Sequence, residues 1–170
     1  MSLDNCYRAY GRYLVALNRL NPVLDAAIVR EAGLGPATGA ILVGALNTRA
    51  RLATLRGLLL NAGGEKADLV PMLSDFAQVT KKQLIAQGVA FPGGTDSLLF
   101  QKPDVSGRGV HTIEYTSAEI DALADDLEQR LDAVARSLDI GAADLAALKR
   151  ANDEFGHRKP RRGGAAEESE

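Results

Sequence analysis

Uncharged polar side chains end the helix expected over residues 65–88, and they could hold a phosphate or face a second polar surface. Steps of three and four residues give a row that begins apolar and turns polar: Leu69, Leu73, Phe76, Thr80, Gln83 and Gln87. Lys82 stands beside Gln83 and could pair with a phosphate as a point charge. Because buried amides need hydrogen-bond partners, we expect these glutamines to meet another polar surface, water in a cleft or a second subunit.

Three features follow one another in the chain around this row. They are the helical segment Ala50-Arg51-Leu52-Ala53-Thr54-Leu55-Arg56, the segment Lys81-Lys82-Gln83-Leu84-Ile85-Ala86-Gln87-Gly88, and then a small hairpin with a closing helix. Together they resemble the HEPN (higher eukaryotes and prokaryotes nucleotide-binding) domain proteins of bacteria, over roughly residues 7–138. The resemblance implies a helical bundle that forms a homodimer. Active members of this family are metal-independent ribonucleases whose Arg-polar-x-x-x-His motif faces the dimer cleft.

The chain departs from that motif at the positions that carry its chemistry. In the family register, Lys82 occupies the arginine position, Gln83 the polar position and Gln87 the histidine position. Glutamine has no pKa near neutrality, so Gln87 cannot act as a general acid or base. Lysine lacks the planar fork with which arginine holds a phosphate. We therefore expect a catalytically degenerate, dimeric binding or regulatory protein that binds RNA or a protein partner without cleavage.

Other functions stay open at this point. A diverged ribonuclease could use Lys82, His111 or the face that carries Arg49 and Arg56. The bundle could also be a structural or accessory scaffold, for instance in a phage, defence or toxin-antitoxin context. A plainer interpretation is that lysines and glutamines near a helix end form a solvated terminus.

Charged side chains elsewhere give further candidates. Arg49 and Arg56 are seven residues apart on one helix face and could line a cleft with phosphate-binding charge, although solvated or ion-paired arginines are commoner. His111 has no second metal-ligating residue at a suitable spacing. Aspartates at 121, 125, 126 and 132 belong to the polar face of a helix. We expect no metal and no cofactor.

Hydrophobic periodicity predicts an all-α fold, an antiparallel helical bundle with a small β-hairpin inserted before the penultimate helix. The first helix has an apolar row and is either kinked at Pro22 or divided there; the row is Leu3, Tyr7, Tyr10, Leu14, Leu17, Leu24 and Ile28. A second helix is expected from Pro36 through Leu59, and a third over residues 65–88.

The later part of the chain has stronger local signals. A turn-rich centre followed by an alternating second arm, Val110 to Tyr115, predicts a β-hairpin at about residues 97–115. Thr116-Ser117-Ala118-Glu119 is a capping box that opens a helix, and a short helix is expected from Ala142 to about Arg150. We therefore expect one domain over residues 1–151 and a disordered charged tail over 152–170.

Composition limits the remaining classes. The 170 residues carry a net charge of -2, which gives no overall attraction to nucleic acid, so RNA contact would need a local basic patch. The single cysteine, Cys6, cannot form an intramolecular disulfide, and the first residues lack a signal-peptide pattern. No apolar run is long enough to cross a membrane. We therefore expect a cytoplasmic protein with no membrane partner.

Overall fold

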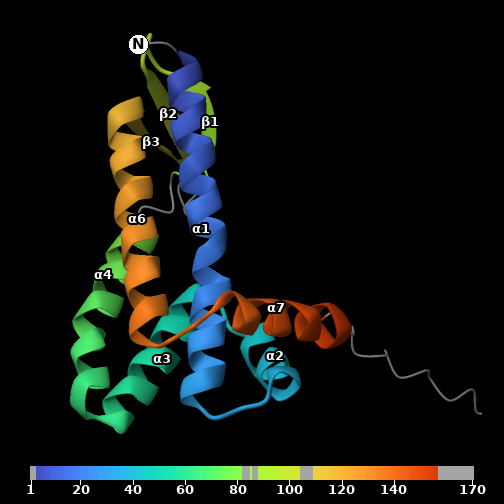
Figure 1. The fold of residues 1–170 in the computed structure, drawn as a ribbon. Coiled ribbons are helices and arrows are strands. Elements are labelled where there is room, and N and C mark those ends of the chain that lie inside the picture. The colour runs from blue at the N-terminus through green and yellow to red at the C-terminus, as the bar shows by residue number, and fades with distance from the viewer. Residues whose placement is uncertain (1–2, 82–84, 86–87, 104–108, 157–170) are drawn as a thin grey trace, which may run out of the picture.

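The computed structural model describes residues 3–81, 85, 88–103 and 109–156. It is mostly helical, with one three-stranded antiparallel sheet, so the expected helical fold is confirmed in outline while the sheet is larger than a hairpin. In Figure 1 the molecule has the shape of an L. We call the upright arm, formed by α1, α6 and the sheet, the stem. We call the arm that leaves it, formed by α2, α7 and the turn η2, the foot.

Helix α1 (Leu3–Glu31) runs the whole length of the stem and continues through Pro22 without a break. Its buried face begins with Cys6, Ala9, Tyr13, Ala16 and Leu20. The expected row holds at Leu3, Tyr10 and Leu17, which pack against the core, and was wrong at Tyr7, which is 46% exposed. Small residues such as Ala9 and Ala16 also face the core. Alanines allow α6 to approach closely, which explains why they occupy the contact.

Helix α6 (Ser117–Ser137) packs along α1, and the two helices run parallel. Their direction follows from the ion pairs between them, since Arg12 reaches Asp121 and Arg19 reaches Asp132. The antiparallel arrangement was therefore a wrong expectation for this central pair. The chain turns at the base through α2 and α3, then returns along α4 and the sheet before α6 begins at the top (Figure 1).

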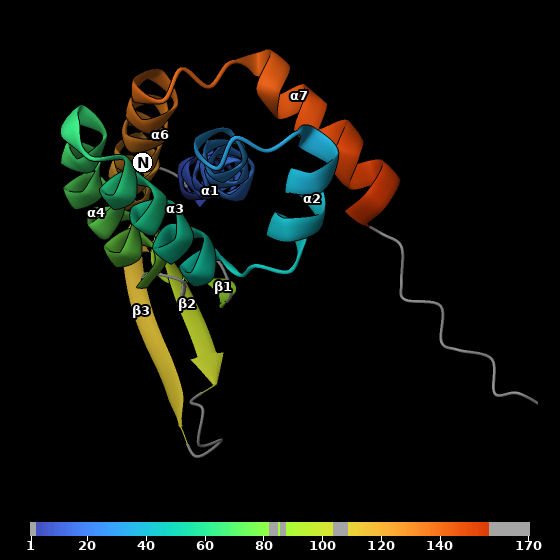
Figure 2. The same ribbon diagram turned by 90° about the horizontal axis from the view of Figure 1, so that it is seen from below.

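The single helix expected from Pro36 to Leu59 is in fact two helices, α2 (Pro36–Gly44) and α3 (Thr48–Ala62). Asn47 caps α3, because its side chain accepts a hydrogen bond of 2.9 Å from the amide of Ala50. The apolar spacing continues across the break, so periodicity alone did not reveal it. Figure 2 shows α2 and α3 on different sides of α1.

A short 3₁₀ turn, η1 (Gly64–Leu69), leads into α4 (Val70–Lys81), where Pro71 lies in the first turn as expected. The hairpin is confirmed as β2 (Ser97–Pro103) paired with β3 (Val110–Thr116). Strand β1 (Val89–Pro92), which was not predicted, pairs with the outer edge of β2. The sheet packs on α1 through Phe100, whose ring lies 5.2 Å from that of Tyr10.

The capping box at the start of α6 is confirmed, with the Thr116 amide donating to Glu119 at 2.8 Å. Helix α7 (Ala142–Ala151) follows and continues into η2, a π-helical turn over Asn152–Gly156 that contacts α2. The expected tail boundary at residue 152 was therefore too early. The rest of the expected tail lies outside the described residues. Among the described helices, none is both long and apolar enough to cross a membrane.

The contact between α1 and α2 predicts a large effect of a small substitution. A Cβ added at Gly39 would lie 2.8 Å from Cγ1 of Val29 and closer still to Cγ2. Gly39→Ala should therefore lower the free energy of unfolding by about 1–3 kcal/mol. In the matched control Gly57→Ala, nothing lies within 4 Å of the new Cβ. That change should raise the free energy of unfolding by about 0.5–1 kcal/mol in urea titration. Equal effects of the two substitutions would contradict the packing of α2 on α1.

Candidate functional site

Ile85 belongs to the segment that resembles the ribonuclease motif, and the structure places this residue against the stem. Its side chain is fully buried, and its carbonyl accepts a hydrogen bond of 3.1 Å from the hydroxyl of Tyr10 on α1. This bond ties Ile85 to the stem at the level where Tyr10 also meets Phe100. Lys82, Gln83 and Gln87 themselves lie outside the described residues.

The two candidate arginines of α3 are exposed. Arg49 and Arg56 make no hydrogen bond or ion pair with any other residue that the structure describes, so both guanidinium groups are available to an anion there. The start of α3 is held against α1 at Asp25, through Arg51. Tyr10, which binds Ile85, lies fifteen residues before Asp25 on α1, so the two anchor points are about 22 Å apart along the axis of α1. Arg49 and Ile85 therefore lie at different levels of the stem.

Arg51, which the sequence placed beside these arginines, has a structural role. Its Nε and Nη2 donate to the two carboxylate oxygens of Asp25 at 2.5 and 3.1 Å. It also donates to the carbonyls of Val43, at 3.0 Å, and of Leu46. Burial raises the pKa of Asp25, and the Arg51 guanidinium opposes that rise. An aspartate inside the apolar run from Val23 to Val29 was the signal that could have predicted this pair.

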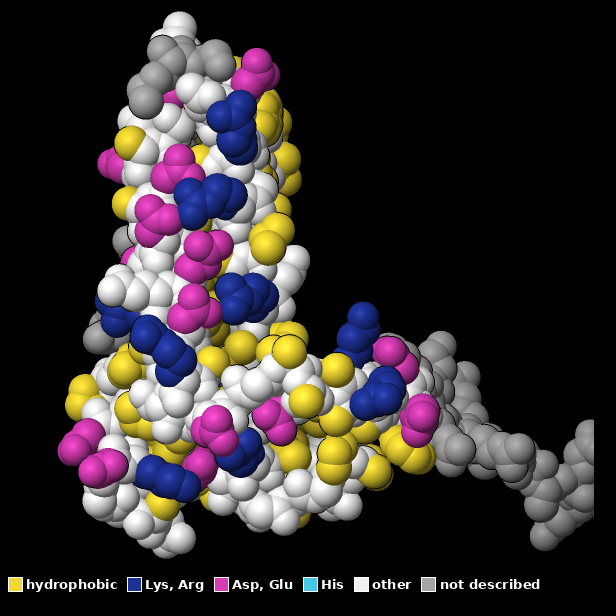
Figure 3. All heavy atoms as spheres, viewed as in Figure 1, with side chains coloured by type: hydrophobic (Ala, Val, Ile, Leu, Met, Phe, Trp, Pro, Cys, Tyr) yellow, Lys and Arg dark blue, Asp and Glu magenta, His cyan; other side chains and the backbone are white. Residues whose placement is uncertain are grey.

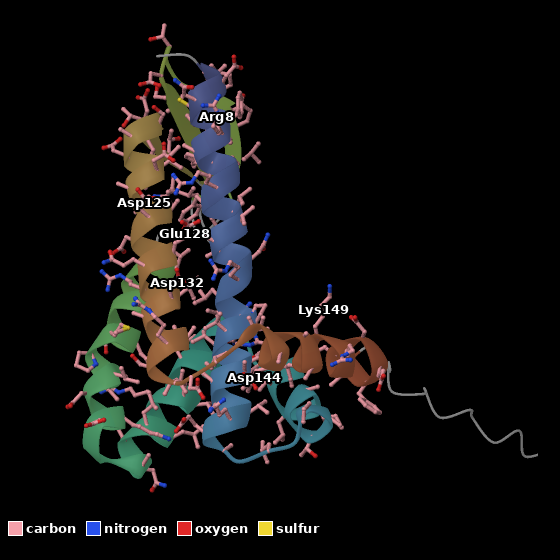
Figure 4. All side chains as sticks on the ribbon, viewed as in Figure 1. Arg8, Asp125, Glu128, Asp132, Asp144 and Lys149 are labelled. Atoms are coloured by element: carbon pink, nitrogen blue, oxygen red, sulfur yellow. The ribbon has the colours of Figure 1, made fainter. Side chains whose placement is uncertain are left out.

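The aspartates of α6 are engaged in ion pairs. Arg12 bridges Asp121 and Asp125 at 2.7 and 2.6 Å, and Arg19 reaches Asp132 at 3.0 Å. Figure 4 shows Asp125, Glu128 and Asp132 in a line along α6 beside α1. These ion pairs link the exposed borders of the two helices, while Asp126 pairs with Arg130 within α6. Solvation alone was therefore an incomplete expectation for these carboxylates.

The remaining reactive side chains do not form a catalytic group. His111 is exposed on β3, opposite Lys102 of β2. Cys6 is buried, and burial together with a contact to Asp96, at 3.6 Å, raises the pKa of its thiol. Such a thiol is a packed side chain and a poor nucleophile. Within the described part of the chain, no three His, Cys, Asp or Glu residues are close enough together to hold a metal ion.

A groove in the inner corner of the L was not predicted from the sequence. We call it the corner groove. It consists of two adjoining hollows of about 300 and 330 Å³ between α1 and α7, which share Pro22 and Leu145. Its walls are mainly apolar, and its polar lining residues are Asn18, Arg19, Asp25, Lys149 and Asn152. In Figure 3 hydrophobic side chains line the angle between stem and foot.

Comparison with known proteins gives no further identification. No protein-family model, curated protein or solved structure matches the chain.

The buried pair of Asp25 and Arg51 predicts a pH-dependent loss of stability. Arg51→Met removes the charge that opposes burial of Asp25, so the free energy of unfolding at pH 7 should fall by about 3–5 kcal/mol. The pKa of Asp25 is then raised further above its ordinary value of 3.8. A carboxyl group with a raised folded-state pKa destabilises the fold when ionised, and this effect disappears as pH falls toward the unfolded value. The deficit should therefore narrow between pH 7 and pH 4.

The matched control is Arg49→Met, because Arg49 lies on the same helix and is exposed. Its effect should stay within about 0.5 kcal/mol. Chemical denaturation of wild type and both variants at several pH values measures the difference. A deficit for Arg51→Met that does not change with pH would show that Asp25 is not the source of the loss.

Proposed function

We propose that this chain is a HEPN-like binding protein that has lost the ribonuclease chemistry and recognises RNA through its phosphates. The observation that carries the proposal is the anchored position of Ile85, whose side chain is buried and whose carbonyl accepts a hydrogen bond from Tyr10 of the stem. Gln83 and Gln87 stand two residues before and after Ile85 in the sequence. Their amides are suited to a polar partner, and neither glutamine can transfer a proton at neutral pH.

The exposed arginines of α3, Arg49 and Arg56, support phosphate binding over recognition of bases. Figure 2 shows α3 and the hairpin on the same side of α1. The two arginines could neutralise phosphates of a single strand that crosses this side, an interaction that weakens as salt rises.

A diverged ribonuclease has less support from the geometry. General acid-base chemistry needs a second group within hydrogen-bonding reach of the base. His111 has only the cationic side chain of Lys102 as its cross-strand neighbour. A scaffold role remains compatible with the same fold, and it would be favoured by protein binding without any RNA binding.

Restoring the motif tests the proposed register directly. Wild type should not cleave single-stranded RNA in the presence of EDTA, because Gln87 offers no titratable group. The double variant Lys82→Arg, Gln87→His should gain cleavage, because it supplies the phosphate fork and the proton-transfer group together. Cleavage is followed on a fluorescently labelled oligonucleotide by gel electrophoresis.

The matched control is Lys82→Arg with Gln78→His, which introduces the same residue types with the histidine nine residues earlier on the helix. It should remain inactive. Metal-independent cleavage by wild type that Gln87→Ala abolishes would overturn the proposal. If wild type shows no salt-sensitive RNA binding, the scaffold role replaces it.

A further inference from the structure

The upper half of α1 presents an uncovered face that continues into the corner groove. In steps of three and four residues this face carries Asp4, Tyr7, Gly11, Val15, Asn18 and Pro22. Val15 is 62% exposed and Tyr7 46%, which is unusual for large apolar side chains in the middle of a helix face. Between Asp4 and Pro22 this row has no charge, and we call it the α1 stripe.

Two backbone features make the α1 stripe suitable for close contact with another helix. A Cβ added at Gly11 would have nothing within 4 Å, so this glycine is not required by any contact within the described chain. Glycine in a helix interior costs about 1 kcal/mol relative to alanine, and it lets a second backbone approach. Pro22 has no N–H, so it leaves the carbonyl of Asn18 without its usual helical donor. That carbonyl lies beside the corner groove, where Asn18 and Pro22 both form the wall.

We propose that a second copy of this chain occupies the corner groove, with the two α1 stripes packed antiparallel about a two-fold axis near Val15. An axis at this position sets Tyr7 of one copy opposite Pro22 of the other, and Gly11 opposite Asn18. The ring of Tyr7 then enters the hollow beside Pro22 and Leu145, and its hydroxyl can donate to the free carbonyl of Asn18. A two-fold interface must be self-complementary, and the α1 stripe meets that condition over about 22 Å.

Charge complementarity selects a second copy over an unrelated helix. Lys149 rises from α7 on the side of the foot that faces the stem (Figure 4), and it has no ion pair with another described residue. Asp4 lies one turn beyond Tyr7 and is likewise exposed and unpaired within the described chain. When Tyr7 sits at Pro22 of the second copy, Asp4 reaches the level of Lys149 on that copy's foot. The symmetry repeats this ion pair at both ends of the interface.

This inference does not depend on RNA binding, and its test uses the full chain. Wild type should be a dimer by light scattering at micromolar concentrations. Val15→Arg places two like charges at the two-fold axis and should weaken self-association at least tenfold. Leu60→Arg changes an apolar residue of α3 that is 53% exposed, against 62% for Val15, and this matched control should remain dimeric. Both sites are exposed, and circular dichroism verifies that both variants fold.

A charge exchange identifies the orientation of the two copies. Lys149→Glu and Asp4→Lys should each weaken the dimer, because each sets like charges against each other, and the double variant should restore it. A chain that is monomeric at all concentrations would overturn the inference. A dimer that survives Val15→Arg but dissociates on Gln83→Arg would overturn it too, because the copies would then meet at the motif-like segment.

Discussion

The arrangement of the lower half of the molecule depends on one buried ion pair. The guanidinium of Arg51 donates two hydrogen bonds to Asp25 of α1. It also donates to the carbonyl of Val43, in the last turn of α2, and to that of Leu46, just after α2. A buried pair of this kind adds little net stability, but it penalises any packing in which either charge loses its partner. One side chain therefore sets the angle between α2 and α3. Because α7 and η2 rest against α2, the direction of the foot follows from the same contact.

Helix α1 serves two different environments along its length. From Val23 to Val29 every residue is buried, because α2, α3 and α7 surround this end. Above Pro22 only the face toward α6 and the sheet is covered, and ion pairs such as Arg12 with Asp121 close one border of it. Pro22 lies at the boundary between the two regimes. The L shape follows from this change, because α2 and α7 surround only the lower end of α1 and leave its upper part free of the foot.

Local signals in the sequence predicted part of the second half of the fold. The capping box at Thr116 and the pairing of β2 with β3 depend on residues close in the sequence, so both could be predicted. Strand β1 and the turn η2 after α7 have no such local signal and were missed. The break at Asn47 could not be predicted either, because the apolar spacing continues across it. Hydrophobic periodicity does not encode tertiary contacts. It therefore could not predict the parallel packing of α1 and α6 or the pairing of Arg51 with Asp25. For the candidate site, residue types indicated that Arg49 and Arg56 would be charged and accessible, but not the separation between them and Ile85.

The two surfaces considered for function lie on different sides of α1. Tyr10, which holds Ile85, and Val15, at the centre of the α1 stripe, point about 140° apart around the helix axis. Pairing of two copies through the α1 stripe therefore leaves Tyr10 and Ile85 outside the interface. Self-association at one side of α1 and RNA binding near Ile85 at the other would then not compete for the same surface.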